Sequence, residues 1–307
     1  MRGILVNTDP NSFKQYMTER NMQIEEALAS SLPVEWDVPQ PLRESMNYSL
    51  MNGGKRVRPL LVLAAAEALG GSHEAAMPVA CAIEMIHTYS LIHDDLPAMD
   101  NDEYRRGKLT NHKVYGEAMA TLAGDGLLTH AFYSIVQSHR KYGVNPFQTL
   151  AIVEELATYA GAKGMVGGQA ADMLGEQGLT KLEELEYIHQ HKTSDLIVFS
   201  LRAGARITDA TEEQLQALTT FGYGIGLAFQ IQDDILDLIG DEAKLGKHIN
   251  SDVKQGKVTY PYFIGLEASM QKVTQLTEEA KAAIMNSTIP NPTRLLEFAD
   301  YLMNRDH

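Results

Sequence analysis

The chain has 307 residues, of which 44% are hydrophobic and 21% are charged, and its formal net charge at pH 7 is −14. This composition is typical of a folded globular protein, and the acidic balance argues against binding to nucleic acid or to an anionic membrane, since both need a basic face. A single cysteine, Cys81, excludes an intramolecular disulfide and favours a reducing, cytoplasmic location.

From its N-terminus onward, the chain has the pattern of consecutive helices. The first 17 residues contain an apolar run of only three residues, so we expect no signal peptide. Apolar residues at helical spacing then occupy five segments, which Gly, Pro or Asn residues bound: 11–32, 58–71, 73–95, 116–139 and 147–174.

The rest of the chain continues this pattern. No proline occurs between Pro97 and Pro146 or between Pro146 and Pro261, and β-branched runs joined by Asn-Gly turns are missing, which argues against a sheet. Residues 214–232 carry no charge but hold four glutamines and three glycines, which predicts a buried helix rather than a membrane span. We predict an all-α protein with one domain, residues 1–307, of about ten or more helices.

Carboxylates are crowded in the stretch "HDDLPAMD". Because Pro97 blocks a regular helix, we expect Asp94 and Asp95 in the last turn of the preceding helix, with Asp100 and Asp102 in the loop that follows. Adjacent carboxylates repel one another, and the negative end of the helix dipole adds to their attraction for cations. This stretch therefore predicts a cation site.

A second stretch, "QIQDDILDLIGD", repeats the arrangement. At about 100° per residue, one side of its helix carries Gly226, Gln230, Asp233, Asp234 and Asp237. The run from Asp100 lacks the glycine and glutamate of a calcium EF-hand loop, whereas oxygen ligands of this kind suit Mg²⁺ together with water and phosphate. Two copies in apolar helices favour a metal site over a solvated acidic surface.

Basic residues lie close to the first aspartate motif. The clusters are Lys55, Arg56 and Arg58 in "GGKRVRP", and Arg105, Arg106 and Lys108 in "RRGK". Arginine matches phosphate oxygens in pairs and lysine supplies a mobile charge, so the combination predicts a diphosphate bridged to the protein by metal. Residues 240–261, with Lys244, Lys247, Lys254 and Lys257 among glycines, predict a mobile lid over that diphosphate.

Together, these motifs resemble the trans-isoprenyl diphosphate synthases. The motifs that carry the resemblance are "GGKRVRP", "DDLPAMD…RRGKLTNH", "GDGLL", "GMVGGQAADM", "HKTSDLI", "FQIQDDILD" and "GDEAKLGKHINSDVKQGKVTYP". The bacterial farnesyl branch of the family is the most similar. The resemblance implies the isoprenoid synthase type I fold, a helical bundle around a deep central cavity, and a homodimer.

The resemblance also implies roles for individual residues. The expected metal ligands for Mg²⁺, for which Mn²⁺ can substitute, are Asp94, Asp95, Asp100, Asp233, Asp234 and Asp237. Isopentenyl diphosphate is expected to bind Lys55, Arg58, His87 and Arg106, and the allylic diphosphate to contact Arg105, Lys192, Thr193, Gln230, Lys247 and Lys257. The expected catalytic set is Asp94, Asp95, Asp100, Lys192, Thr193, Gln230 and Asp233.

The implied reaction joins isopentenyl diphosphate head-to-tail to dimethylallyl and then geranyl diphosphate, giving farnesyl diphosphate and diphosphate. Positive charge around the leaving group stabilises the ionising transition state, so no protein nucleophile is needed. In the family, an aromatic residue five positions before the first aspartate forms the cavity floor. That position is Tyr89, followed by Ser90, and it implies a fifteen-carbon product, although helix geometry brings Ser90 closer than Tyr89 to the Asp94 face.

Three alternatives remain open. The first alternative is a different product within the enzyme class: geranyl diphosphate, with ten carbons, or geranylgeranyl diphosphate, with twenty. A noncatalytic partner subunit is a second alternative, but such subunits are expected to lack aspartates or basic residues that are complete here. A di-iron helical bundle is the third, because Glu84–His87 and Glu186–His189 have the Glu-x-x-His spacing, which leaves the paired aspartates unexplained.

Overall fold

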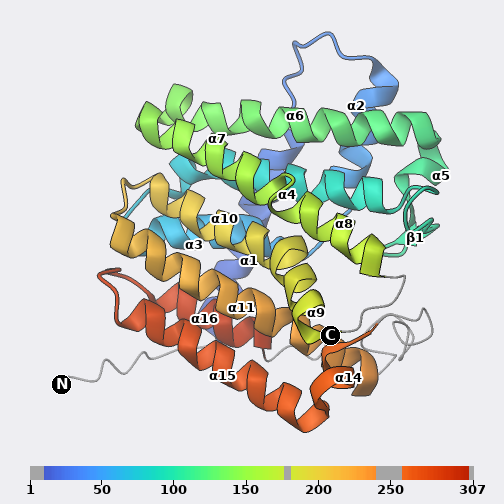
Figure 1. Cartoon of the computed structure of the whole chain (residues 1–307). Coiled ribbons are helices and arrows are strands. Elements are labelled where there is room, and N and C mark those ends of the chain that lie inside the picture. The colour runs from blue at the N-terminus through green and yellow to red at the C-terminus, as the bar shows by residue number, and fades with distance from the viewer. Residues whose placement is uncertain (1–9, 176–180, 240–257, 304–307) are drawn as a thin grey trace.

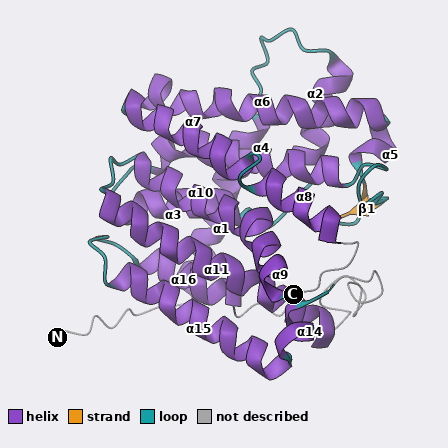
Figure 2. Ribbon diagram, viewed as in Figure 1, coloured by secondary structure: helices purple, strands orange, loops and turns teal. Residues whose placement is uncertain are grey.

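The computed structural model describes residues 10–175, 181–239 and 258–303, and within them long helices dominate (Figures 1 and 2). The N-terminal helices are α1 (Pro10–Ala29), α2 (Gln40–Leu50), α3 (Val57–Ala68), α4 (His73–Asp94), α5 (Asn111–Tyr115) and α6 (Glu117–Tyr142). The middle of the chain forms α7 (Pro146–Ala160), α8 (Met165–Gly175), α9 (Leu182–Ile188), the π-helical turn η1 (His189–Ser194) and α10 (Asp195–Arg206). The remainder forms α11 (Glu212–Ile239), α14 (Tyr260–Ile264), α15 (Leu266–Met285) and α16 (Thr293–Met303).

The central helix is α4, which packs against α3, α6 and α10. Its Ser72 side chain accepts a hydrogen bond from the Ala75 amide at 3.2 Å, so the helix begins with a regular cap. Among the described residues, α4 alone is long and apolar enough to cross a membrane, but 67% of its apolar window is buried inside the protein. Its composition is therefore that of a core helix, surrounded by other helices.

Buried apolar side chains form two clusters. The larger one extends from Phe13 in α1 to Leu302 in α16 and includes nearly the whole inner face of α3 and α4. The smaller one includes Leu185, Ile231 and Tyr260 and packs α9 and α14 against α11. The uncharged segment 214–232 lies within α11 and is largely buried, as predicted, and its Gly222 allows close packing against Val198 and Leu201 of α10.

Two details differ from the sequence prediction. The segment 147–174 is divided into α7 and α8 by a turn at Gly161–Gly164, where a side chain on Gly164 would overlap the Tyr159 carbonyl. A short antiparallel hairpin, β1 (Tyr104–Arg105) and β2 (Lys108–Leu109), occurs in an otherwise helical structure. Its two-residue turn needs positive φ angles, which Arg106 (53°) and Gly107 (76°) adopt.

Candidate functional site

A cavity of about 560 Å³ opens between α4, α8 and η1. Most of its lining is apolar, and a few charged side chains lie on its wall. The lining includes the predicted site residues Arg58, His87, Tyr89, Ser90, Asp94, Lys192 and Thr193. The structure thus brings together residues that are up to 135 positions apart (58 to 193) in the sequence.

The first aspartate motif sits where α4 ends. Asp94 is the last residue of the helix and Asp95 is its C-cap, as predicted, and the Asp100 amide donates to the Asp94 carbonyl at 2.9 Å. Burial raises the pKa of the Asp94 carboxyl to about 6; the charge of Lys192 opposes this, and that of Asp100 adds to it. A carboxylate in this state gains stability from any cation that approaches it.

The two adjacent aspartates have different surroundings. The Asp95 carboxylate is 3% exposed and faces Arg105, whose Nη2 and Nε atoms lie 2.6 Å and 2.8 Å from Oδ1. Burial raises the pKa of Asp95, and the Arg105 guanidinium opposes that shift. In the structure, Arg105 therefore holds Asp95, while Asp94 faces the cavity.

The hairpin β1–β2 positions both predicted arginines. Arg105 points back to Asp95, and the next residue, Arg106, donates from Nη1 to the Gly53 carbonyl. A side chain on Gly54 would overlap the Arg106 guanidinium, so the "GG" before the first basic cluster gives this arginine room. The two basic clusters of the sequence are thus neighbours in the fold.

Arg58 and His87 also line the cavity, in a part of the wall where several arginine charges act. The Nε atom of Arg58 is buried and makes no hydrogen bond within the described part of the chain. Burial lowers the pKa of His87 well below its usual value, and the charges of Arg58 and Arg106 lower it further. A bound anion would relieve both effects, which makes this wall a candidate phosphate site.

Arg56, between the two predicted ligands Lys55 and Arg58, has a different role. It is 3% exposed and its guanidinium binds Glu25 at 2.7 Å, Glu84 at 2.5 Å and the Leu50 carbonyl at 2.7 Å. Its backbone adopts a left-handed conformation, with φ of 50°, at the start of α3. Arg56 therefore joins α1, α3 and α4 and is not available to a ligand.

Lys192 and Thr193 reach the cavity from the π-helical turn η1. Lys192 Nζ lies 2.7 Å from Asp172 Oδ2 on α8. Burial alone would lower the pKa of Lys192, but the nearby carboxylates of Asp172, Asp94 and Asp100 raise it. The ammonium is therefore held close to the first aspartate motif.

The second aspartate motif lies near the C-terminal end of α11. Asp234 and Asp237 are 9% and 0% exposed, whereas Asp233 and Gln230 are partly exposed. Asp234 Oδ2 accepts the Tyr260 amide at 2.7 Å and lies 3.4 Å from His189 Nε2. In this conformation, Asp234 therefore contacts α14 and η1.

The residues fit a divalent cation by their chemistry, although the metal-binding geometry is not preformed. No group of three or more His, Cys, Asp or Glu side chains capable of holding a metal ion occurs within the described residues. The donor atoms of both motifs are carboxylate oxygens, which Mg²⁺ prefers, and half-buried Asp94 has a raised pKa, which a cation would reverse. The described residues thus supply suitable donors, and the metal itself would complete their arrangement.

Tyr89 closes part of the cavity wall. It is 6% exposed and stacks edge-to-face on His93, with ring centroids 5.7 Å apart. Burial raises the pKa of the Tyr89 hydroxyl to about 12, with Asp94 adding to the shift. Both Tyr89 and Ser90 line the cavity, so the helix geometry that favoured Ser90 does not exclude Tyr89.

Some cavity residues were not singled out from the sequence. Asp172 binds Lys192, and Gln169 lines the cavity with a buried Oε1 atom that has no hydrogen-bond partner in the described chain. Both lie in the motif "GMVGGQAADM", three positions apart and thus on one helix face, which is the signal that would have found them. Thr121 of α6 also contributes to the lining.

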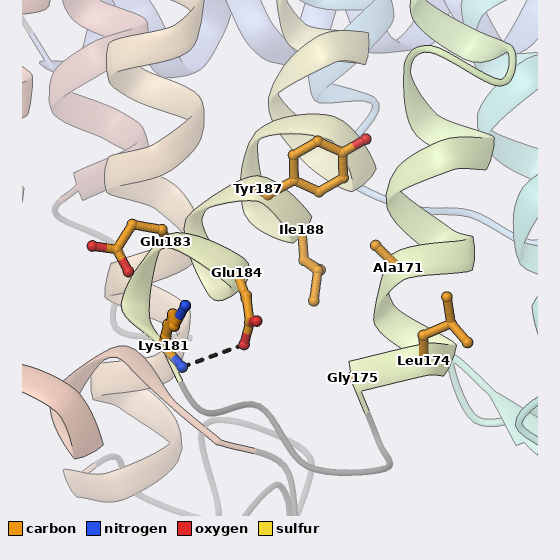
Figure 3. Close-up of a pocket in the computed structure, with 8 residues that line it drawn as sticks. All are labelled: Ala171, Leu174, Gly175, Lys181, Glu183, Glu184, Tyr187 and Ile188. Carbon is orange, nitrogen blue, oxygen red and sulfur yellow. Dashed lines mark hydrogen bonds between the residues drawn. The ribbon is translucent and has the colours of Figure 1, made fainter.

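A second hollow, between α8 and α9, is a poorer candidate (Figure 3). It also measures about 560 Å³, but its lining holds one lysine and two glutamates, and the Lys181 amide is bound to Glu184 at 3.3 Å. It lacks a basic cluster that could hold a diphosphate. The structure does not describe residues 240–257, which make up most of the predicted lid. The predicted ligands Lys247 and Lys257 therefore lie outside the described residues.

These features define a class of protein: a helical bundle whose apolar cavity has carboxylates and cations on its wall, suited to a ligand with a hydrocarbon tail and a diphosphate. Residues 39–288 match the polyprenyl synthetase family. The chain is 49% identical to the farnesyl diphosphate synthase of Bacillus subtilis (strain 168) over 297 residues, which cover 97% of this chain and 99% of the relative. The chain therefore belongs to the polyprenyl synthetase family.

Further comparisons agree with this assignment. The chain is 46% identical to the chloroplastic geranylgeranyl pyrophosphate synthase of Capsicum annuum, over 97% of this chain and 80% of the relative. It superposes on the geranylgeranyl pyrophosphate synthetase from Pyrococcus horikoshii Ot3 with a TM-score of 0.86 and 31% identity, covering 96% of this chain and 99% of that chain. The predicted isoprenoid synthase fold and the predicted family are confirmed.

The di-iron alternative is not supported by the structure or by the family match. Glu84 binds Arg56 at 2.5 Å and Glu186 accepts the Tyr260 hydroxyl at 2.7 Å, so the two Glu-x-x-His pairs have separate structural partners. The family match and the absence of a three-ligand cluster among described residues agree with this. The Glu-x-x-His spacing is a common consequence of polar residues one helical turn apart.

Proposed function

We propose that the chain is a farnesyl diphosphate synthase, a prenyltransferase that joins isopentenyl diphosphate head-to-tail to dimethylallyl and geranyl diphosphate. One observation carries the proposal: a single cavity is lined by Asp94 and Lys192 together with the cationic Arg58 and the neutral His87. The identity of 49% to a bacterial farnesyl diphosphate synthase supports the same reaction.

In the first step, the allylic diphosphate would leave its carbon. The residues that would hold Mg²⁺ are Asp94, Asp95, Asp100, Asp233, Asp234 and Asp237. When bound, the metal supplies positive charge that stabilises the departing diphosphate. Lys192 and Arg105 add fixed positive charge beside Asp94, and the apolar lining keeps water from the allylic cation.

In the second step, the double bond of isopentenyl diphosphate would attack that cation. Lys55, Arg58, His87 and Arg106 would bind its diphosphate, and the unpartnered Nε atom of Arg58 supports this role. Thr193 lines the cavity beside Lys192, where its dipole would steady the cation, and Gln230 would act from α11. The released diphosphate would accept the proton that is lost when the new double bond forms.

The buried Tyr89 ring supports a fifteen-carbon product. Its ring lines the cavity and packs edge-to-face on His93, where it would limit the space for a longer chain. A geranylgeranyl product is the second candidate, because a geranylgeranyl pyrophosphate synthase is 46% identical to this chain.

We propose further that residues 1–307 act as one domain, in the cytoplasm, and as a homodimer. The buried cysteine, Cys81, is consistent with a reducing compartment. Large apolar side chains are exposed on α6 and α7, namely Leu122 (53%), Phe147 (81%) and Leu150 (65%), and a second copy would cover them. Light scattering of the purified protein tests the dimer, and a monomer would reject it.

A product assay tests the function. The purified chain is incubated with Mg²⁺, labelled isopentenyl diphosphate and, separately, dimethylallyl, geranyl or farnesyl diphosphate. We expect fifteen-carbon product from the first two primers and none from the third. Twenty-carbon product would assign the geranylgeranyl reaction, and no product with any primer would reject the proposal.

A further inference from the structure

The π-helical turn η1 separates the cavity from a second, polar cavity on its other side. Such turns are rare, because each widens the helix by one residue, and they occur frequently at functional sites. On one side, Lys192 and Thr193 line the main cavity. On the other side, His191 lines a cavity of about 310 Å³ together with Asp195, Tyr223 and Lys163.

Three side chains form a hydrogen-bonded network on this second side. Asp195, the first residue of α10, is 3% exposed. Its Oδ2 atom lies 2.7 Å from His191 Nδ1, and its Oδ1 atom accepts the Tyr223 hydroxyl at 2.9 Å. One buried carboxylate thus connects η1, α10 and α11 through both of its oxygens. Burial raises the pKa of Asp195, whereas the hydrogen bonds from His191 and Tyr223 oppose that rise.

Glycines fix the turn from its flanks. A side chain on Gly168 of α8 would overlap the Lys192 amide nitrogen, and one on Gly226 of α11 would overlap the Ser194 side chain. The Ser194 hydroxyl donates to the His189 carbonyl at 3.2 Å, within the turn itself. The backbone is thus packed tightly on these two flanks.

The remaining side is packed less closely, although the His191 ring lies against Tyr187 of α9, with ring centroids 4.2 Å apart. Because a cavity of about 310 Å³ lies there, dispersion contacts restrain the turn only weakly in that direction. Asp195 accepts hydrogen bonds from His191, one turn earlier in the same helical run, and from Tyr223 of α11, and all three side chains line this cavity. Together with the Lys192–Asp172 ion pair and the Tyr187–His191 ring contact, these hydrogen bonds restrain η1 from relaxing away from the main cavity.

We propose that His191, Asp195 and Tyr223 form a clamp that positions Lys192 and Thr193 for the reaction. The three are positioning residues, because they line the cavity behind the turn while Lys192 and Thr193 line the main cavity. This inference rests on the proposed roles of Lys192 and Thr193. A misplacement of about 1 Å at a reacting centre lowers a rate by about 10²-fold, so a modest relaxation of η1 has a measurable effect.

The experiment compares steady-state kinetics of Asp195→Ala, Asp195→Asn and Tyr223→Phe with geranyl and isopentenyl diphosphate. We expect kcat to fall by about 10- to 100-fold for Asp195→Ala. Asn keeps an acceptor for one of the two hydrogen bonds and Phe removes one, so both variants are expected to lose less. The KM for isopentenyl diphosphate is expected to stay unchanged, because Arg58 and His87 do not belong to the clamp.

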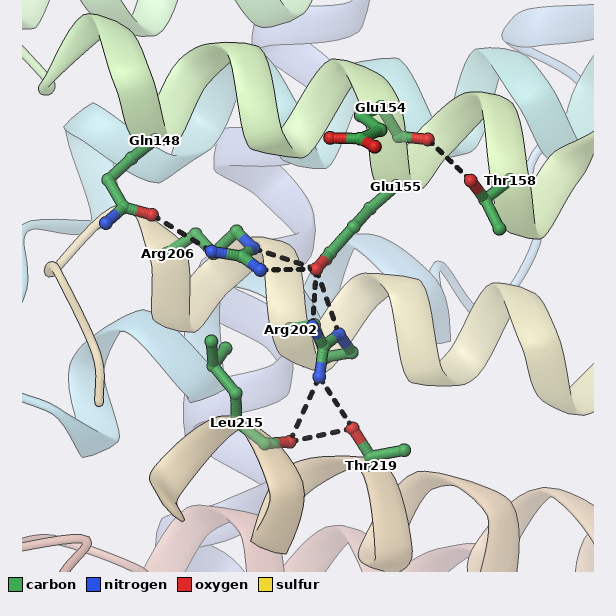
Figure 4. Close-up of polar contacts among 8 residues, drawn as sticks. All are labelled: Gln148, Glu154, Glu155, Thr158, Arg202, Arg206, Leu215 and Thr219. Carbon is green, nitrogen blue, oxygen red and sulfur yellow. Dashed lines mark hydrogen bonds and ion pairs between the residues drawn. The ribbon is translucent and has the colours of Figure 1, made fainter. Parts of the chain in front are cut away.

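Glu155→Gln is the matched control. Glu155 lines the same second cavity and binds Arg202 and Arg206, but it does not contact η1 through any described hydrogen bond (Figure 4). We expect the melting temperature of this variant to fall. At a temperature where the variant is folded, we expect its kcat to equal that of the native chain. An equal loss of kcat in this control would show a general structural effect and would overturn the clamp.

A double-mutant cycle separates this inference from the proposed site. If the clamp acts through Lys192, then Asp195→Ala adds little to the loss already caused by Lys192→Ala. A full kcat in all three clamp variants, alongside an impaired Lys192→Ala variant, would overturn the clamp alone. A full kcat in Lys192→Ala would overturn the proposed site and the clamp with it.

Discussion

Two clusters of charged side chains in this molecule differ in how their charges are paired. In the cluster between α7, α10 and α11, Glu155 Oε1 lies 2.5 Å from Arg202 and 2.7 Å from Arg206, and these arginines also bind Thr219 and Gln148 (Figure 4). At the main cavity, by contrast, Arg58 Nε has no described partner and Asp94 has a raised pKa. A carboxylate in direct contact with two arginines holds helices together, even though Glu155 Oε2 has no described hydrogen-bond partner, whereas charges without an opposite charge in direct contact mark the place where a ligand binds.

The same contrast occurs over a distance of two residues. Arg56 is enclosed by Glu25, Glu84 and the Leu50 carbonyl, while Arg58 lines the cavity beside His87. Sequence proximity therefore does not make a functional cluster. The direction in which α3 turns each side chain separates the structural arginine from the ligand-binding one.

The largest expected effect comes from Asp94→Asn. Removing this charge weakens the stabilisation of the leaving group, so we expect kcat to fall by about 10²- to 10³-fold, the size found when one preorganised transition-state contact is lost. Product formation from geranyl and isopentenyl diphosphate at saturating Mg²⁺ measures it. The unfolding midpoint should not fall, because a buried carboxylate with a raised pKa is replaced by a neutral group. A kcat close to native would remove Asp94 from the site.

A matched pair of arginine variants tests the contrast directly. Arg56→Met leaves Glu84 and Glu25 unpaired, and we expect it to lower the free energy of unfolding by about 3–5 kcal/mol. Arg58→Met removes a desolvated charge, so we expect no loss of stability but a raised KM for isopentenyl diphosphate. Urea unfolding and steady-state kinetics measure the two effects. Equal destabilisation by both variants would show that Arg58 is structural too.

A smaller change in activity, but a change in product, is expected for Tyr89→Ala. Removing the ring opens the wall that His93 braces and enlarges the cavity available to the growing chain. Product chain lengths, read after dephosphorylation, should shift from fifteen carbons toward twenty or more. Ser90→Ala, at the neighbouring position on the same wall, serves as the control and should keep the native product. An unchanged product from the Tyr89 variant would assign chain length to another residue.

The smallest expected effect is on pH dependence. The folded protein lowers the pKa of His87, so below about pH 6.5 the unfolded chain binds a proton that the folded chain does not. Stability contributed by neutral His87 is therefore present above that pH and is lost as the pH falls through it. We expect the unfolding free energy of His87→Gln to fall less steeply between pH 7 and pH 5 than that of the native chain. Denaturant titrations measure this, and identical slopes would contradict the shifted pKa.

Local patterns were sufficient for much of the fold. The apolar periodicity of 73–95 predicted α4 almost to the residue, and Pro97 predicted that the helix would end at Asp94 and Asp95. The same periodicity predicts one continuous helical segment over 147–174, whereas the structure has a turn at Gly161–Gly164. That turn depends on a close approach to the Tyr159 carbonyl, which apolar periodicity does not indicate. The hairpin at Arg106–Gly107 was missed because two-residue strands carry no periodicity.

The sequence by itself determined the all-helical class, the two aspartate motifs and the presence of basic clusters, because these depend on residue type and short-range spacing. Only the tertiary structure decided which charges are free to act. In the fold, Arg56 is enclosed by other side chains, whereas Arg58 lines the cavity. Asp95 pairs with Arg105, while Asp94 lines the cavity together with Lys192. Asp234 accepts the Tyr260 amide. The physical reason is that a charge acquires its function from its burial and its partners, and both depend on segments that are distant in sequence.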